Sequence, residues 1–297
     1  MSKFKTFLQS LIGTLLVNSL LVLSPVLAQS YPQAQNIAST SNLSENWAGY
    51  VANSGGYSGV NATWIVPAVS TVNASNLSAD AMWVGIGGVS STDLIQAGTQ
   101  AIIQNGQITY KAWYETLPNA AVNIPLSIKA GDSIKVAITE ISPNLWQITF
   151  TNNSTNQSYT QNVSYVSSHS SAEWIEERPV EYSSGRLIPL DNFGTLFVMN
   201  GAAIQNGSNV NIAKTGATAL TMTTFSGILL ASPSGLVNGD SFSISRSSNQ
   251  TVMETVPTST PTTIRVIRVT WRRGSDVTQR EFIRTFFSQF GLRTRTH

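Results

Sequence analysis

The sequence predicts an all-β domain made of many short antiparallel strands, as in a β-sandwich or a β-barrel. Charged residues make up only 11% of the 297 residues, which disfavours disorder, coiled coils and helical bundles because these need Glu, Lys and Arg in quantity. Asn-Gly pairs, which favour hairpin turns, recur at 105–106, 200–201, 206–207 and 238–239. Before residue 270 no stretch shows the apolar period of a helix.

Residues 1–28 have the features of a secretory signal. Two lysines precede a mostly apolar stretch from Leu11 to Leu23, and small residues lead up to a cleavage site after Ala28. The alternative is an uncleaved membrane anchor, but Asn18 and Ser19 interrupt the apolar run, and a span needs about 20 apolar residues. We therefore expect an exported protein, extracellular or periplasmic, with no membrane span after signal cleavage.

The chain after the leader divides into a lead-in and a strand-rich domain. Residues 29–44 are polar and unpatterned, which predicts a flexible segment. From 45 to 247 strand-like runs alternate with turn signals such as Ala130-Gly131-Asp132 and Pro143-Asn144. The predicted strands are Ala62–Val66, Ala81–Gly85, Thr109–Glu115, Ser133–Thr139, Trp146–Thr151, Glu173–Glu177, Thr195–Asn200 and Ser241–Ser245.

The last fifty residues differ in charge from the domain before them. Residues 45–247 hold 7 Lys and Arg against 12 Asp and Glu, whereas residues 248–297 hold 8 Arg against 3 acids. Phe282, Phe286 and Phe290 recur at helical spacing in this basic extension. Three interpretations stay open: an accessory tail that packs on the acidic domain, a membrane-surface helix, or a reading-frame accident that replaced the natural end.

Two scarcities restrict the chemistry. The chain has no cysteine, which removes thiol nucleophiles, thiolate metal sites and disulfides. Its two histidines are His169 and the terminal His297, so a zinc site with several histidines is excluded and a Ser-His-Asp site would have to use His169. The motifs of serine hydrolases, zinc proteases, pepsin-like enzymes and nucleotide-binding proteins are absent. Catalysis would therefore use carboxylates, amides or hydroxyls.

Three aromatic-rich stretches carry the remaining candidates: Met82–Gly88 continuing to Leu94–Gly98, Tyr110–Glu115, and Ala172–Glu177. Because alternate residues of a strand share a face, Trp113 and Glu115 point the same way, and so do Glu173 and Glu177. An unpaired carboxylate is costly in a core. On the residues alone, ordinary solvated acids remain an alternative to a functional site.

With Asn46-Trp47-Ala48-Gly49 at the domain start, these stretches resemble the glutamic peptidases, the eqolisin family. The likeness covers residues 45–247 and keeps the order of the family's motifs. It implies a sandwich of two packed, curved antiparallel sheets, similar to concanavalin, with a catalytic Gln and Glu on the concave face. By motif these are Gln96 and Glu177, while Trp113 and Glu115 line the substrate cleft. Gly87 departs from the pattern, because better-known fungal members carry an Asp there.

The resemblance implies a secreted acid endopeptidase that acts on polypeptides without a metal or cofactor. Glu177 is expected to act as general base and then acid, and Gln96 to hold the water and donate to the oxyanion. Both side chains must then reach one shared water. We expect a monomer with no nucleic-acid partner. The alternatives are a carbohydrate-binding sandwich, whose aromatic rings would stack on sugars, and a cell-surface adhesion domain.

Overall fold

The computed structural model describes residues 42–72, 76–181, 184–248 and 264–265. The predicted leader, most of the lead-in and nearly all of the basic extension, with its predicted helix, lie outside the described residues. Within these ranges no helix is long and apolar enough to cross a bilayer.

Strands dominate the described chain, with one short 3-10 helix, η1 (Ala213–Thr215). In chain order the strands are β1 (Asn42–Ser44), β2 (Trp47–Ala52), β3 (Tyr57–Ile65), β4 (Leu77–Gly87), β5 (Leu94–Gln104), β6 (Gln107–Thr116), β7 (Val122–Ile124), β8 (Ser133–Ser142), β9 (Leu145–Asn152), β10 (Gln157–Ser164), β11 (Ala172–Glu177), β12 (Val180–Glu181), β13 (Thr195–Gln205), β14 (Ser208–Asn211), β15 (Thr218–Thr223), β16 (Leu229–Pro233), β17 (Phe242–Arg246) and β18 (Ile264–Arg265). The prediction of an all-β fold is confirmed.

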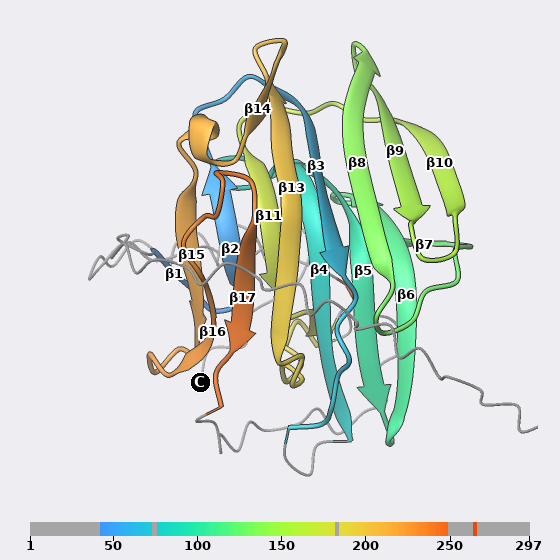
Figure 1. The fold of residues 1–297 in the computed structure, drawn as a ribbon, viewed down its shortest axis with the longest axis vertical. Helices are drawn as coiled ribbons and strands as arrows, with labels where there is room; N and C mark the ends of the chain where they lie inside the picture. The colour runs from blue at the N-terminus through green and yellow to red at the C-terminus, as the bar shows by residue number, and fades with distance from the viewer. Residues whose placement is uncertain (1–41, 73–75, 182–183, 249–263, 266–297) are drawn as a thin grey trace, which may run out of the picture. The chain divides into compact units, whose positions relative to one another are not determined.

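One continuous sheet contains sixteen of these strands (Figure 1). Its order is β10-β9-β8-β3-β13-β17-β16-β15-β2-β11-β4-β5-β6-β7, with β1 beside β15 and β14 beside β13. Every pairing is antiparallel except that of β1 with β15. The sheet folds over, because β3 and β8 of one half contact β4 and β5 of the other half.

The main core lies between the two facing halves. It takes inward residues from both, such as Trp64 and Phe150 from one half and Trp174 and Ile95 from the other, all fully buried. The strands that carry the predicted catalytic pair, β11 with Glu177 and β5 with Gln96, lie on either side of β4 in the second half. The inward residues of β11 and β5 pack against the first half of the sheet. The outward residues of these strands therefore form a surface that is backed by the core.

Most predicted turns are confirmed, and one is wrong. Asn-Gly turns at 105–106, 206–207 and 238–239 have positive φ at both residues, which is the geometry that favours this pair. Asn200-Gly201 instead lies inside β13, where the register against β3 shifts between Met199 and Ala202. A Cβ on Gly201 would stand 2.4 Å from the Ile212 side chain. Asn200 and Gly201 therefore form a β-bulge instead of a turn, and Gly201 lies close to Ile212.

Two strands lie at the edges of the predicted domain. Asn42–Ser44, the end of the predicted flexible lead-in, forms β1 beside β15. Ile264–Arg265 of the basic extension forms β18, which pairs antiparallel with β12. This pairing places part of the extension beside Val180–Glu181, a strand that begins three residues after Glu177.

Candidate active site

A second apolar cluster lies on the opposite face of the sheet half that carries Gln96 and Glu177, the predicted catalytic pair. We call this surface the site face: the outward residues of β2, β11, β4, β5 and β6. Its apolar members include Trp47, Trp83, Trp113, Ile175 and Leu94, all buried. The predicted alternation is confirmed, since Glu173 and Glu177 share this face with Gln96 and Glu115.

Gln96 and Glu115 form a direct pair on this face. They are register partners on β5 and β6, and Gln96 Nε2 donates to Glu115 Oε2 at 2.7 Å. Both side chains are fully buried. The carboxylate therefore fixes the orientation of the carboxamide.

Glu177 lies in a nest of N–H donors. Its Oε2 accepts from Trp83 Nε1 at 2.7 Å, and its Oε1 accepts from Asn46 Nδ2 at 2.9 Å. Burial raises the pKa of Glu177 well above its usual range, and the charge of Glu115 adds to the increase. The donors Trp83 and Asn46 oppose it, as does the nearby Trp47 indole, whose N–H falls outside hydrogen-bond geometry. Burial outweighs the donors, so the net effect is a raised pKa.

The sheet register separates the two predicted dyad residues along the strands. One row crosses four strands and contains Glu173, Gly85, Gln96 and Glu115. Glu177 lies opposite Ala81, which is four residues from Gly85 on β4. The rows are therefore about 13 Å apart along the strand, at about 3.3 Å per residue. Gln96 and Glu177 face the same way but have different immediate partners, and the register brings Gln96 into one row with Glu115 and Glu173, not with Glu177.

Glu173 is a site-face carboxylate to which the sequence assigned no role. It occupies the row of Gln96 and is fully buried. Its Oε2 lies 3.3 Å from where a Cβ on Gly85 would stand. Gly85 thus makes room for this carboxylate between β11 and β5.

The structure gives a reason for glycine at position 87. Its φ is +86°, and a Cβ there would stand 2.7 Å from both the main-chain oxygen and Oδ2 of Asp93. A side chain at this position would require the loop to shift. The carboxylate of Asp93 already occupies that space.

Sequence reasoning missed a group of buried carboxyls on the other side of the same sheet half. Asp80 and Glu176 point to the core face, and Asp191 lies nearby; all three are fully buried or nearly so. Burial raises the pKa of each, to about 7 for Asp80, and the mutual repulsion of their charges raises those of Glu176 and Asp191 further. Among the described residues no group of His, Asp and Glu is arranged to hold a metal ion.

A model of the peptidase A4 family matches residues 45–253. The chain belongs to the peptidase A4 family. It is similar to aspergillopepsin-2 of Aspergillus niger, 31% identical over 199 residues that cover 59% of this chain and 70% of that protein. Scytalidopepsin B of Scytalidium lignicola is 28% identical over 192 residues, covering 61% of this chain and 72% of its own.

Solved structures extend the likeness to the fold of the A4 family. Scytalido-glutamic peptidase bound to a peptide-based transition-state analogue matches with a TM-score of 0.59 and 25% identity, covering 68% of this chain and 98% of that one. Aspergilloglutamic peptidase from Aspergillus niger matches with a TM-score of 0.51 and 30% identity, covering 57% and 99%. This A4 peptidase is therefore a glutamic endopeptidase, as the eqolisin resemblance implied.

Proposed function

We propose that this chain is an exported endopeptidase that hydrolyses peptide bonds in acid by direct attack of water. Glu177 is the general base and then the general acid, and Gln96 holds the water and donates to the oxyanion. The observation that carries the proposal is the pair of environments on one face. A carboxylate sits among indole and amide donors, and a carboxamide is oriented by a second carboxylate.

The chemistry follows from these groups. Ionised Glu177 takes a proton from water as its oxygen attacks the carbonyl carbon, and the carbonyl oxygen gains the negative charge. Gln96 donates one N–H of its amide to Glu115, and in the proposed reaction this amide also donates to the oxyanion. Such a donor contributes about 3 kcal/mol or more. Glu177 then passes its proton to the departing nitrogen as the C–N bond breaks.

The other site residues support this pair. Trp83 and Asn46 stabilise the ionised form of Glu177 through their hydrogen bonds, and Trp113 forms part of the apolar wall of the site face. Gln96 and Glu177 are fully buried, so a polypeptide reaches them only after the residues covering the site face move. Leu117 and Ala121 pack there, and both belong to the connection from β6 to β7.

We also infer the wider organisation. The folded-over sheet forms a sandwich of two curved layers over residues 45–247, the signal at 1–28 is removed on export, and the mature protein is a monomer. The basic extension is an accessory tail, supported by the pairing of β18 with β12. A sugar-binding module would need exposed aromatic rings, but the six tryptophans between positions 47 and 174 are all buried.

The test is digestion of a denatured protein between pH 3 and pH 7, with pepstatin present to suppress pepsin-like contaminants. We expect Glu177→Gln and Gln96→Ala each to lose nearly all activity. Glu176→Gln is the matched control for the first, because Glu176 is buried on the same strand but faces the core. Gln104→Ala is the control for the second, at the far end of β5.

Both controls should keep the wild-type activity, and circular dichroism should show all four variants folded. An inactive wild type, or full activity in folded Glu177→Gln, would overturn the proposal. Binding of polysaccharide by an inactive wild type would instead support the carbohydrate-binding alternative.

A further inference from the structure

Two loops lead into the strands that carry the proposed dyad. The β4–β5 loop, residues 88–93, ends where β5 begins, three residues before Gln96. The β10–β11 loop, residues 165–171, ends where β11 begins, and that strand carries Glu177. The strands β5 and β11 do not pair with each other, since β4 lies between them.

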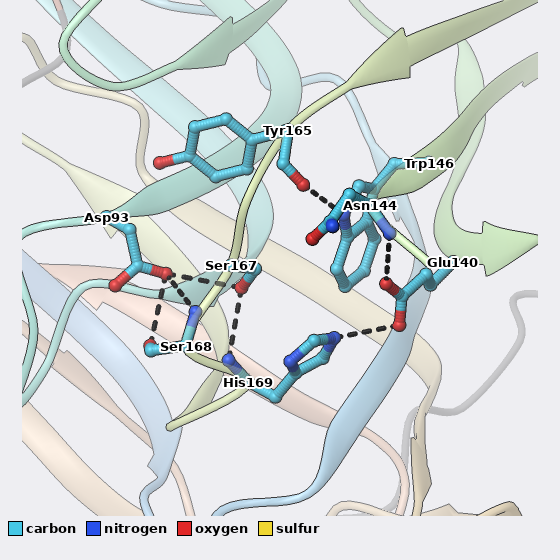
Figure 2. A network of polar contacts seen from close by, with 8 residues as sticks. All are labelled: Asp93, Glu140, Asn144, Trp146, Tyr165, Ser167, Ser168 and His169. Atoms are coloured by element: carbon cyan, nitrogen blue, oxygen red, sulfur yellow. Dashed lines mark hydrogen bonds and ion pairs between the residues drawn. The ribbon is translucent and has the colours of Figure 1, made fainter. Parts of the chain in front are cut away.

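Asp93 joins these two loops through one carboxylate oxygen (Figure 2). Its Oδ2 accepts from Ser168 N at 2.7 Å, from Ser168 Oγ at 3.1 Å and from Ser167 Oγ at 3.2 Å. All three donors belong to the β10–β11 loop. Asp93 is therefore a link between the start of β5 and the chain entering β11.

Neighbouring serines and main-chain groups extend the link. Ser91 Oγ lies 3.1 Å from Ser170 Oγ. Gly87 N donates to Ser171 O at 2.9 Å, and Val89 N donates to Ser171 Oγ at 3.4 Å. The tie thus continues to the last residue before β11.

The β10–β11 loop is itself held firmly by the other half of the sheet. His169 Nε2 is 2.8 Å from Glu140 Oε2, and its ring stacks on Trp146 with centroids 5.4 Å apart. Trp146 Nε1 donates to Tyr165 O at 3.0 Å (Figure 2). Asp93 therefore connects the start of β5 to a loop that is itself bonded to the first half of the sheet.

Tyr165 of the same loop contacts the main chain at the ends of both strands that carry the pair of Gln96 and Glu115. Its Oη accepts from Leu94 N at 2.7 Å and donates to Leu117 O at 2.9 Å. Leu94 is two residues before Gln96, and Leu117 is two residues after Glu115. The loop that Asp93 holds therefore also clamps the strand ends beside the proposed oxyanion donor.

We propose that Asp93 is a positioning residue for the peptidase reaction, which sets Gln96 relative to Glu177 by tying the start of β5 to the start of β11. This inference rests on the proposed function. The two side chains lie in different rows and on strands that do not touch, so their spacing depends on the backbone. A misplacement of about 1 Å in such a pair costs up to about 100-fold in rate.

The link suits acid conditions. Burial alone would raise the pKa of Asp93, but the hydrogen bonds from Ser168 and Ser91 outweigh burial and lower it. The carboxylate thus keeps its acceptor character as the solution is acidified.

The experiment measures kcat and KM for Asp93→Ala, Asp93→Asn and a control, Asp132→Ala. Asp132 Oδ2 also accepts one main-chain and one side-chain N–H, from Lys129 at 3.0 Å and Asn152 at 2.9 Å, but in a turn that leads into neither β5 nor β11. Asp93→Ala should lower kcat by about 10- to 100-fold with little change in KM. Asp93→Asn keeps an acceptor for Ser168 N and should retain most of kcat. Asp132→Ala should lower the melting temperature and leave kcat unchanged.

Hydrogen exchange provides a readout that does not require activity. The amides of Gly87 and Leu94, which donate across the tie, should exchange faster in Asp93→Ala and at the wild-type rate in Asp132→Ala. If Asp93→Ala does not fold, the double variant Ser167→Ala/Ser168→Ala, which removes two of the three donors, replaces it with the same expected direction.

The outcomes separate the two proposals. A folded Asp93→Ala with wild-type kcat and wild-type exchange overturns the inference, as does a loss of kcat no larger than that of Asp132→Ala. An inactive wild type counts against the proposed function alone. In that case wild-type exchange in Asp93→Ala would still reject the tie.

Discussion

Replacing Asp80 by Asn should make the protein much more stable at neutral pH and little different in acid. Asp80 is 2% exposed on the core side of β4, and its Oδ1 accepts from Ala101 N at 3.1 Å. Asparagine keeps that acceptor in a side chain of nearly the same shape. The change therefore removes the ionisation and leaves the hydrogen bond.

The magnitude follows from the pKa of Asp80. Burial raises it from 3.8 in the ordinary state to about 7 in the folded state. Below pH 3.8 both the folded and the unfolded chain carry the neutral acid, and the stability is fully present. Between pH 4 and pH 7 the unfolded chain ionises first and binds fewer protons, so the free energy of unfolding falls as the pH rises. At about 1.4 kcal/mol per pH unit, the loss is about 4 kcal/mol.

Urea denaturation at pH 4, 5.5 and 7, followed by tryptophan fluorescence, measures this difference. Wild type and Asp80→Asn should differ little at pH 4, while at pH 7 the variant should unfold at clearly higher urea. Asp93→Asn is a control of opposite sign, because hydrogen bonds lower the pKa of Asp93 and its contribution is lost as the pH falls. A gap between wild type and Asp80→Asn that is the same at pH 4 and pH 7 would refute the reasoning.

Three further predictions concern activity. Because burial raises the pKa of Glu177, the acid limb of kcat/KM against pH should lie above the value of about 4.3 for an ordinary glutamic acid; a limb at or below that value would contradict the buried environment. Trp83→Phe removes the donor at 2.7 Å from Glu177 Oε2 and should move that limb to still higher pH, whereas an unchanged limb would show that this bond does not stabilise the base. Truncation after Ser248 removes β18, which pairs only through two residues, and should leave folding and activity at least equal to those of the full chain; loss of folding would show that the extension is part of the domain.

The motifs predict the strand that carries Glu177 and the face on which its side chain lies. Once Glu173–Glu177 is a strand, alternation places Glu177 on the same face as Ile175, and the structure agrees. The partners of Glu177 were less accessible. Asn46 is 131 positions away and Trp83 is 94 positions away. Only the pairing of β11 with both β2 and β4 brings them to one carboxylate, and no local pattern encodes that pairing.

The strands that the sequence missed have weak local signals. β5 contains Gly98, whose Cβ would collide with Met82 O at 2.1 Å, so glycine is required there although it lowers strand propensity. β10 (Gln157–Ser164) is mostly polar because it is the last strand of the sheet order and its side chains are largely exposed. In both cases tertiary packing, and not local propensity, decides the strand.

Glu176 and Glu177 are adjacent, and their ionisation has opposite effects on the protein as the pH rises. Glu177 must ionise to take a proton from water, so a rise in pH increases the active fraction. Glu176 faces the core with Asp80 and Asp191, and ionisation there costs stability because burial and like charges oppose it. The ionised Glu177 also disfavours the ionisation of Glu176. Activity and stability therefore change in opposite directions as the pH rises, because ionisation of Glu177 increases the active fraction and ionisation of the core cluster lowers the free energy of unfolding. Glu176→Gln should reduce the loss of stability toward neutral pH without moving the acid limb of kcat/KM.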